Sequence, residues 1–145
     1  MIGLVQRVSW AKVVVDDQTI AQIDQGILVL LGMEKSDEQQ QADKLLRRLL
    51  NYRIFADAED KMNLSVKDIK GGVLLVPQFT LAADTKKGLR PSFSSAMPPA
   101  GAEELFSYLL KQSQSSYDKI ASGQFGADMK VSLLNDGPVT FSLNT

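Results

Sequence analysis

The sequence predicts a single domain, residues 1–145, of the α/β (α+β) class, in which segments of strand alternate with two helices. Three observations predict this class. The chain has 145 residues, which is close to the usual length of one domain. Runs of β-branched and apolar residues occur near both ends, and two stretches repeat apolar residues at helical spacing. Hydrophobic residues make up 44% of the chain and charged residues 23%, which is ordinary for a protein with a sizeable core.

The first part of the chain is rich in strand-forming residues. We expect strands over residues 2–8 and 11–15, a turn at 16–18, and a hairpin partner over 19–23. The apolar run from Gly26 to Met33 follows. Because this run is continuous rather than alternating, it suits a central strand that is buried on both faces.

The first helix is predicted from its cap and its spacing. Ser36, followed three residues later by Gln39, matches a capping box, and Asp37 and Glu38 would place negative charge in the first turn. The apolar residues at helical spacing are Ala42, Leu45, Leu46, Leu49 and Leu50. A short strand is expected over residues 52–55.

The middle of the chain contains a strand, a long loop and a second helix. The strand 73–76 ends at Pro77, which has no N–H to donate to a sheet. Residues 82–99 are loop-like, and a loop of this length in a compact domain is usually functional or mobile. The second helix is predicted from the spacing of Ala102, Leu105, Phe106, Leu109 and Leu110.

The last third returns to strands. Apolar and polar residues alternate over 129–133, residues 135–138 have the composition of a turn, and 139–143 read as a final strand.

The chain contains no His and no Cys. Their absence excludes Ser-His-Asp and Cys-His nucleophile systems, zinc or haem sites built on these residues, and disulfides. An enzyme of this composition would use hydroxyl groups, Lys, carboxylates, backbone dipoles or a group on the substrate. The formal net charge of −1 does not indicate a polyanion partner, so any nucleic-acid contact would come from a local patch.

No targeting signal or membrane-spanning run is recognisable. The N-terminal stretch has Gln6, Arg7 and Lys12 among its apolar residues, and the longest apolar run is far shorter than a bilayer-spanning helix. We therefore expect a cytoplasmic protein without a membrane partner.

Two segments are candidates for chemistry. In Val76-Pro77-Gln78-Phe79-Thr80-Leu81, polar side chains follow a buried strand, where active-site groups often project. The alternative is that Phe79 and Leu81 pack in the core while Gln78 and Thr80 satisfy local backbone groups. In Asn135-Asp136-Gly137-Pro138-Val139-Thr140, the Gly-Pro bond is either a simple trans turn, which is the default, or a cis peptide that aims backbone carbonyls in one direction.

Charged clusters give weaker indications. Lys86, Lys87 and Arg90 make the long loop locally positive, as Lys44, Arg47 and Arg48 do for one helix face, and either cluster would suit phosphates or simply a solvated surface. The carboxylates of Asp57, Glu59 and Asp60 match no calcium loop in their spacing and are better explained by a polar hairpin tip.

Taken together, the motifs closely resemble those of the bacterial-type D-aminoacyl-tRNA deacylases, the D-tyrosyl-tRNA(Tyr) deacylase family. The resemblance covers nearly the whole chain and rests on separated segments. These are Met1 to Val8, Asn51 to Phe55, Lys61 to Leu64, Gln78 to Thr85, Gly88 to Phe93, and Asn135 to Thr140.

The resemblance implies a compact, barrel-like β-sheet domain with two flanking helices, similar to the editing domain of some archaeal threonyl-tRNA synthetases. It implies a homodimer with active sites at the subunit interface. It also assigns catalysis to Gln78, Phe79 and Thr80, and implies a Gly137-Pro138 cis dipeptide that enters the site of the other subunit. Arg7 would hold this dipeptide, and Phe125 and Met129, beside Pro77, would line the substrate pocket.

The implied reaction is hydrolysis of the ester in D-aminoacyl-tRNA and in misacylated glycyl-tRNA. The 2′-hydroxyl of the tRNA would assist, backbone donors would stabilise the oxyanion, and the Gly137 and Pro138 carbonyls would exclude an L side chain. No metal or cofactor is implied. The partners would be D-aminoacyl-tRNA and glycyl-tRNA, with no DNA, and Lys86, Lys87 and Arg90 would contact tRNA phosphates.

One position departs from the family pattern. Members usually carry Ser directly before Gln-Phe-Thr, and here that residue is Pro77, which has neither a hydroxyl nor an N–H. An alternative reading is therefore a nucleic-acid-binding or assembly module on the same fold, with impaired catalysis.

Overall fold

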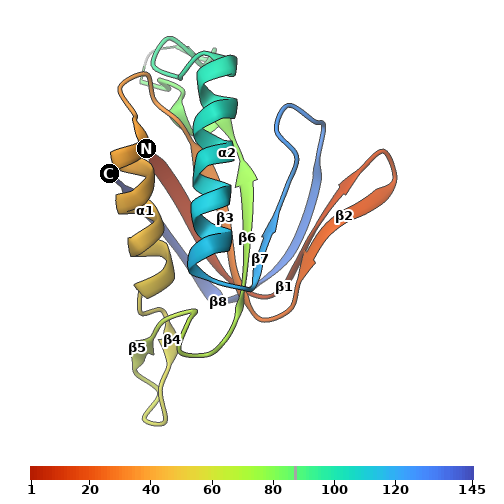
Figure 1. Cartoon of the computed structure of the whole chain (residues 1–145), viewed down its shortest axis with the longest axis vertical. Coiled ribbons are helices and arrows are strands. Elements are labelled where there is room, and N and C mark those ends of the chain that lie inside the picture. The colour runs from red at the N-terminus through yellow and green to blue at the C-terminus, as the bar shows by residue number, and fades with distance from the viewer. Residues whose placement is uncertain (87) are drawn as a thin grey trace.

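A mixed β-sheet that is nearly barrel-shaped forms the body of the molecule (Figure 1). The computed structural model describes residues 1–86 and 88–145. The strand order is β2 (Gln18–Ile23), β1 (Ile2–Val15), β3 (Gly26–Gly32), β6 (Gly72–Pro77) and β7 (Ile120–Ser122), and β8 (Lys130–Asn144) also pairs with β1. The remaining elements are α1 (Gln39–Asn51), the hairpin β4 (Phe55–Ala56) and β5 (Met62–Leu64), the short 3-10 helix η1 (Phe79–Ala82), and α2 (Pro99–Ser116). The α+β class and the two helices are confirmed.

Strand β1 joins the two segments that were expected to be separate strands. Its first half pairs antiparallel with β3, its second half pairs with β2, and β8 pairs with both halves. The register between β1 and β8 shifts between Gln6 and Val8 and again between Val8 and Trp10. These irregularities lie where the two expected strands meet. Pairing with β8 resumes after them, so β1 stays in the sheet as one strand.

The apolar strand β3 is central and buried on both faces, as predicted. Ile27, Val29 and Leu31 belong to the core on the helix side, whereas Leu28 belongs to a second core on the other face. The parallel neighbour β6 repeats this division, because Leu75 faces the first core and Leu74 the second. Burial on both faces explains why these strands carry a continuous apolar run.

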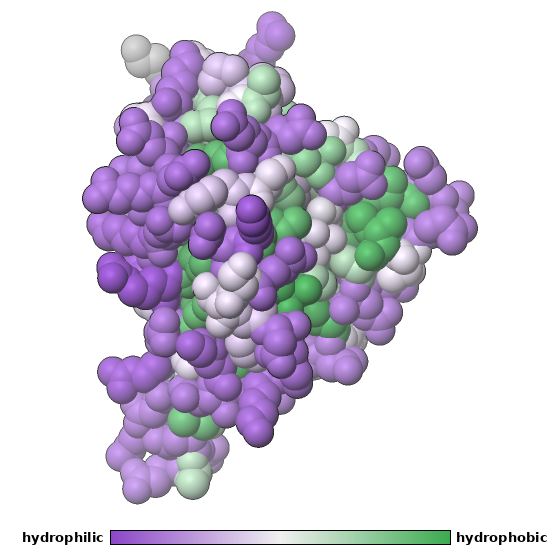
Figure 2. All heavy atoms as spheres, viewed as in Figure 1, coloured by the Kyte–Doolittle hydropathy of each residue, from purple (hydrophilic) through white to green (hydrophobic). Residues whose placement is uncertain are grey.

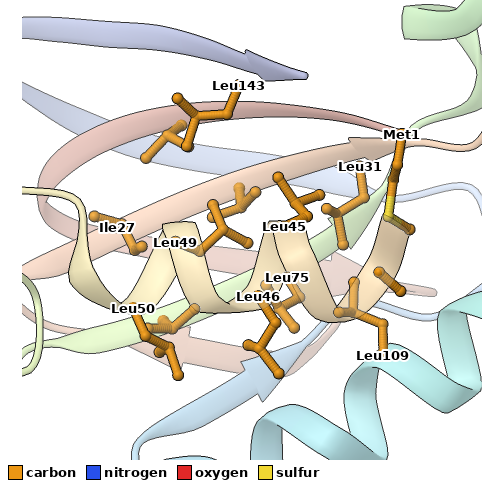
Figure 3. Packing of buried hydrophobic residues seen from close by; sticks show 14 of the residues in the cluster. Met1, Ile27, Leu31, Leu45, Leu46, Leu49, Leu50, Leu75, Leu109 and Leu143 are labelled. Carbon is orange, nitrogen blue, oxygen red and sulfur yellow. The ribbon is translucent and has the colours of Figure 1, made fainter. Parts of the chain in front are cut away.

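Both helices pack on one face of the sheet. Leu45, Leu46, Leu49 and Leu50 of α1 lie over β3 and β6, together with Leu109 of α2 (Figure 3). The spacing of apolar residues therefore predicted the buried face of α1 correctly. The N- and C-termini lie side by side near the start of α1 (Figure 1), and the Thr145 N–H donates to the Met1 carbonyl at 3.1 Å.

The predicted capping box of α1 was wrong by two residues. Helix α1 begins after Glu38, whose N–H donates to the Gln41 side chain at 3.0 Å, so neither Ser36 nor Gln39 provides the cap. The cause is Asp37, whose carboxylate pairs with the buried Met1 ammonium and accepts the Glu34 N–H at 2.7 Å. These contacts hold residues 34–37 outside the helix, and Asp37 and Glu38 precede the first turn.

Two other predicted elements need correction, and one strand of the main sheet was not predicted. Residues 135–138 do not reverse the chain, because Asn135 pairs with Val8 and Thr140 with Gln6, so β8 continues in one direction and bulges there. The strand expected over 52–55 is limited to β4, since Tyr52 still caps α1. Strand β7 was not predicted, and its three residues are too short for a clear periodicity.

The polar tip between β4 and β5 is a hairpin, as predicted. The Asp57 carboxylate accepts the Asn63 amide and the N–H groups of Lys61 and Glu59, and these hydrogen bonds lower the pKa of Asp57. Across residues 1–86 and 88–145, no group of three Asp or Glu side chains is arranged to hold a metal ion. No helix among the described residues has the length and apolar character needed to cross a membrane.

The Met1–Asp37 ion pair generates a stability prediction. Asp37→Asn removes the charge that compensates a buried ammonium, so the free energy of unfolding should fall by about 3 kcal/mol. Urea unfolding followed by circular dichroism measures this loss. Glu59→Gln is the matched control, because the exposed Glu59–Lys61 pair should contribute less than about 1 kcal/mol. Equal losses in the two variants would contradict the importance of the buried pair.

Candidate functional site

The carboxyl end of β6 leads directly into the first candidate segment. Pro77 is half-buried and pairs with Leu31, while the pairing of β6 with β7 stops at Leu75. Pro77 therefore lies beyond the residues of β6 that pair with β7. A proline is tolerated there, because no N–H is needed on that side. The next N–H, that of Gln78, donates to the Leu31 carbonyl at 2.7 Å and fixes the chain as it leaves the sheet.

Phe79 and Thr80 project from the start of η1. The Phe79 side chain is 60% exposed, so the alternative in which it packs in the core is wrong. Its ring lies 5.1 Å from that of Phe93, which is 43% exposed. The Gln78 side-chain amide donates to the Thr80 hydroxyl, so these two polar groups are joined to each other at the surface.

A cavity of about 650 Å³ opens beside this segment. Residues 76–79 form one wall, Phe93 and residues 96–99 of the long loop form another, and residues 125–129 close the third. Ala102 of α2 and Val131 of β8 complete the lining, which is mostly apolar. Such a cavity, with few polar groups at its mouth, is typical of a site for a small organic group.

Phe125 and Met129, which the resemblance places in the substrate pocket, line this cavity. Phe125 packs against Phe106 of α2, with ring centroids 6.3 Å apart. The Met129 sulfur accepts the N–H of Gln124 at 3.4 Å, which joins the side chain to the backbone after β7. Both residues are half-buried, so each contacts the core on one side and the cavity on the other.

Gly137 and Pro138 form a separate, exposed group, and the peptide bond between them is cis. Arg7 anchors the segment that carries them, because its Nε donates to the Asp136 carbonyl at 2.9 Å and its Nη1 to the Ile54 carbonyl at 2.7 Å. Gly137 has a φ of +139°, and a Cβ there would lie 2.6 Å from Val139 and 3.1 Å from Arg7. Only glycine suits this position.

Within one chain the predicted site residues therefore form two groups. Pro77, Gln78, Phe79, Phe125 and Met129 line the cavity, with Thr80 adjacent, whereas Arg7, Gly137 and Pro138 are not part of that lining. The basic residues Lys86 and Arg90 are exposed on the loop outside the cavity, and Lys87 lies outside the described residues. A second hollow of about 410 Å³, at the other end of β6 near Lys70 and Lys119, contains none of the predicted residues.

Several lining residues were not assigned from the sequence. They are Phe93, Ala96, Met97, Pro98, Pro99, Ala102, Gly126, Ala127, Asp128 and Val131. The signal available was the length of loop 82–99 and the presence of Phe93 and Met97 among its polar and small residues. Neither observation shows that the loop folds back over the end of β6.

Comparisons with known proteins match the whole length of this chain. The family model described as D-Tyr-tRNA(Tyr) deacylase matches residues 4–144. A D-aminoacyl-tRNA deacylase of Pseudomonas fluorescens Pf-5 is 61% identical over 145 residues and is covered completely, as is this chain. The Cellvibrio japonicus protein of the same name is 59% identical, with 99% of this chain and 98% of that protein covered.

Solved structures agree with these matches. A structure described as the c-Myc DNA Unwinding Element Binding Protein superposes with a TM-score of 0.96 and 40% identity, covering 100% of this chain and 99% of that one. A structure described as a probable eukaryotic D-amino acid tRNA deacylase has a TM-score of 0.88 and 14% identity over 99% and 98% of the two chains, which supports the fold alone. With a family model spanning residues 4–144 and relatives about 60% identical from end to end, the chain belongs to the D-Tyr-tRNA(Tyr) deacylase family.

Proposed function

We propose that this protein hydrolyses the ester of D-aminoacyl-tRNA and of misacylated glycyl-tRNA, releasing the amino acid and the tRNA. The observation that carries the proposal is the apolar cavity at the carboxyl end of β6, lined by Gln78 and Phe79 with Thr80 next to them, in a member of this family. The cavity would receive the aminoacylated 3′ end of the tRNA. A tRNA substrate also supports a cytoplasmic location.

The chemistry uses a group on the substrate. Water adds to the ester carbonyl, the bond to the 3′-oxygen breaks, and that oxygen gains a proton, with the neighbouring 2′-hydroxyl assisting proton transfer. The N–H of Gln78 is already bonded to Leu31, so we assign the contact with the developing oxyanion to the N–H of Phe79. The Thr80 hydroxyl, held by the Gln78 amide, orients the ester. This division of roles suits a chain without His or Cys.

Rejection of L-amino acids is assigned to Gly137 and Pro138 of a second copy of the chain. Their exposed position, and the hold of Arg7 on the Asp136 carbonyl, support a projecting group that reaches a neighbouring subunit. Fixed backbone carbonyls there would leave no room for an L side chain, whereas a D side chain points elsewhere and glycine has none. The filter then operates by exclusion.

Exposed apolar side chains near this dipeptide support the dimer. Trp10 and Leu134 face each other across β1 and β8 and are 38% and 52% exposed. Apolar side chains also reach the surface over the β1–β2 hairpin, at the right of Figure 2, where Ile20 is 41% exposed. A second copy would cover such residues and bring its own dipeptide to the cavity.

The second candidate function is a nucleic-acid-binding or assembly module with impaired hydrolysis. Pro77, in place of the usual Ser, is the observation that favours it. One solved structure of the same fold is described as a DNA-unwinding-element-binding protein, and a shared fold does not imply a shared function. We favour the hydrolase, because a mechanism that relies on the substrate hydroxyl does not need the missing Ser, and we expect no DNA partner.

The rate of hydrolysis should depend on the stereochemistry of the amino acid and on the 2′-hydroxyl of the tRNA. The protein should hydrolyse D-tyrosyl-tRNA and leave L-tyrosyl-tRNA intact, and a D-substrate with a 2′-deoxy terminal ribose should react at least about 100-fold more slowly. Release of labelled tyrosine under single-turnover conditions measures all three rates. Equal hydrolysis of the D and L esters would refute the chiral filter, and full activity on the deoxy substrate would refute the RNA-assisted step.

Pro77→Ser separates the two candidate functions. If the tRNA supplies the reacting hydroxyl, this change should alter kcat/KM by less than about threefold, because it leaves the Phe79 N–H and the cavity in place. The variant is compared with the unmodified protein on D-tyrosyl-tRNA. A gain of several hundredfold over a nearly inactive parent would instead support the impaired module.

Binding of tRNA should depend on salt through the loop cations. The affinity for tRNA should fall as salt rises, and Lys86→Ala or Arg90→Ala should reduce the slope of log K against log salt by about 1. Filter binding across a salt series measures the slope. Lys61→Ala, an exposed lysine on the distant β4–β5 hairpin, is the control and should leave the slope unchanged. A salt-independent affinity would argue against phosphate contacts.

A further inference from the structure

Met129 borders the cavity from a position directly before β8. On its inner side it packs against the second core, and its sulfur accepts the Gln124 N–H. Because a methionine side chain has three rotatable bonds, its place depends on the surfaces that surround it. The residue under its sulfur therefore affects how much of the cavity is open.

That residue is Gly123, which is buried and follows the last residue of β7. A Cβ added to Gly123 would lie 2.7 Å from the Met129 sulfur, whereas ordinary contacts begin near 3.4 Å. The φ angle of Gly123 lies outside the left-handed region, so the backbone itself accepts any L-residue. The place of the sulfur, rather than backbone conformation, favours glycine here.

The surroundings of Gly123 determine what would move if a side chain were present. Its N–H donates to the Leu75 carbonyl at 2.8 Å, which ties it to the central strand β6. The added carbon would make ordinary contacts with Pro77 and Val76, at 3.6 Å each. Only the sulfur is too close, and the empty space next to Met129 is the cavity.

We propose that Gly123 is a positioning residue of the deacylation site: by having no side chain, it provides a seat for the Met129 thioether and keeps the cavity open. The inference rests on the proposed function and extends it to a residue that touches no substrate. A methyl group at Gly123 would push Met129 into the space that the aminoacylated 3′ end occupies.

The test is Gly123→Ala, assayed on D-tyrosyl-tRNA. KM should rise about tenfold, while kcat should change by less than about threefold, because a methylene-sized change in an apolar pocket acts on binding. Thermal unfolding monitors folding of the variant. Gly101→Ala is the matched control, because its added carbon would lie 3.4 Å from the sulfur of Met97, another lining residue, and KM should stay within about twofold.

A double-mutant cycle shows whether the effect passes through Met129. In the Met129→Ala background the sulfur is gone, so Gly123→Ala should no longer raise KM, whatever Met129→Ala does by itself. An equal rise in both backgrounds would overturn the proposal, since it would place the effect in β7 or its pairing with β6. No rise in either background would overturn it as well.

A spectroscopic measurement makes the inference independent of activity. Of the five methionine methyl resonances, the one lost in Met129→Ala should shift in Gly123→Ala and stay in place in Gly101→Ala. An unmoved Met129 resonance would overturn the proposed seat. If the unmodified protein hydrolyses no ester, the proposed function is refuted. The Met129 resonance would still show whether Gly123 determines the position of the Met129 side chain.

Discussion

The pairing of β1 along both of its edges is the constraint on which the other elements depend. One edge is shared between β3 and β2, and the other is occupied by β8 over nearly its whole length. This arrangement bends the sheet toward a barrel and brings the two chain ends together. It also places the irregular part of β8 opposite Arg7, where a guanidinium can hold the Asp136 carbonyl. The projecting Gly137-Pro138 dipeptide is thus a consequence of strand pairing that fails locally and resumes in the same direction.

The cavity and the dipeptide lie in different parts of the same chain, and the proposed function depends on this separation. The cavity is formed where β6 and β7 end, under a loop that returns to α2. Arg7 and Gly137 belong to β1 and β8 and do not line it. A site that contains both the cavity and the dipeptide needs two copies of the chain. The proposed chiral filter therefore requires the proposed dimer. The exposed Trp10 and Leu134 beside the bulge are consistent with this requirement.

The sequence predicted those features that depend on local pattern. The apolar spacing of α1 and the continuous apolar run of β3 identified the buried faces correctly. In both elements, the geometry of the helix or strand alone decides which side chains face the core. The cap of α1 failed, because Asp37 is bonded to Met1, which is distant in sequence. The apparent turn at 135–138 failed since its direction is set by pairing with β1. The roles proposed for Gln78, Thr80 and Gly137 came from family resemblance. That Phe93 and Met97 line the cavity could not be predicted, because it depends on how the long loop packs against segments distant in sequence.

The cavity lining contains few polar side chains, which matters for the proposed selectivity. Asp128 is the one carboxylate among its lining residues, and the remaining side chains are apolar or carry an amide. In the proposed function, discrimination therefore depends on shape, and positions without side chains contribute to that shape. Gly137 meets this need through backbone conformation as well as space, since its φ of +139° disfavours any L side chain. Gly123 would meet it through space alone, because its φ lies outside the left-handed region while the Met129 sulfur lies 2.7 Å from the place of an added Cβ. The two glycines would thus act by different physical means: Gly137 through its own backbone carbonyl, in the proposed filter, and Gly123 through the neighbouring Met129 side chain.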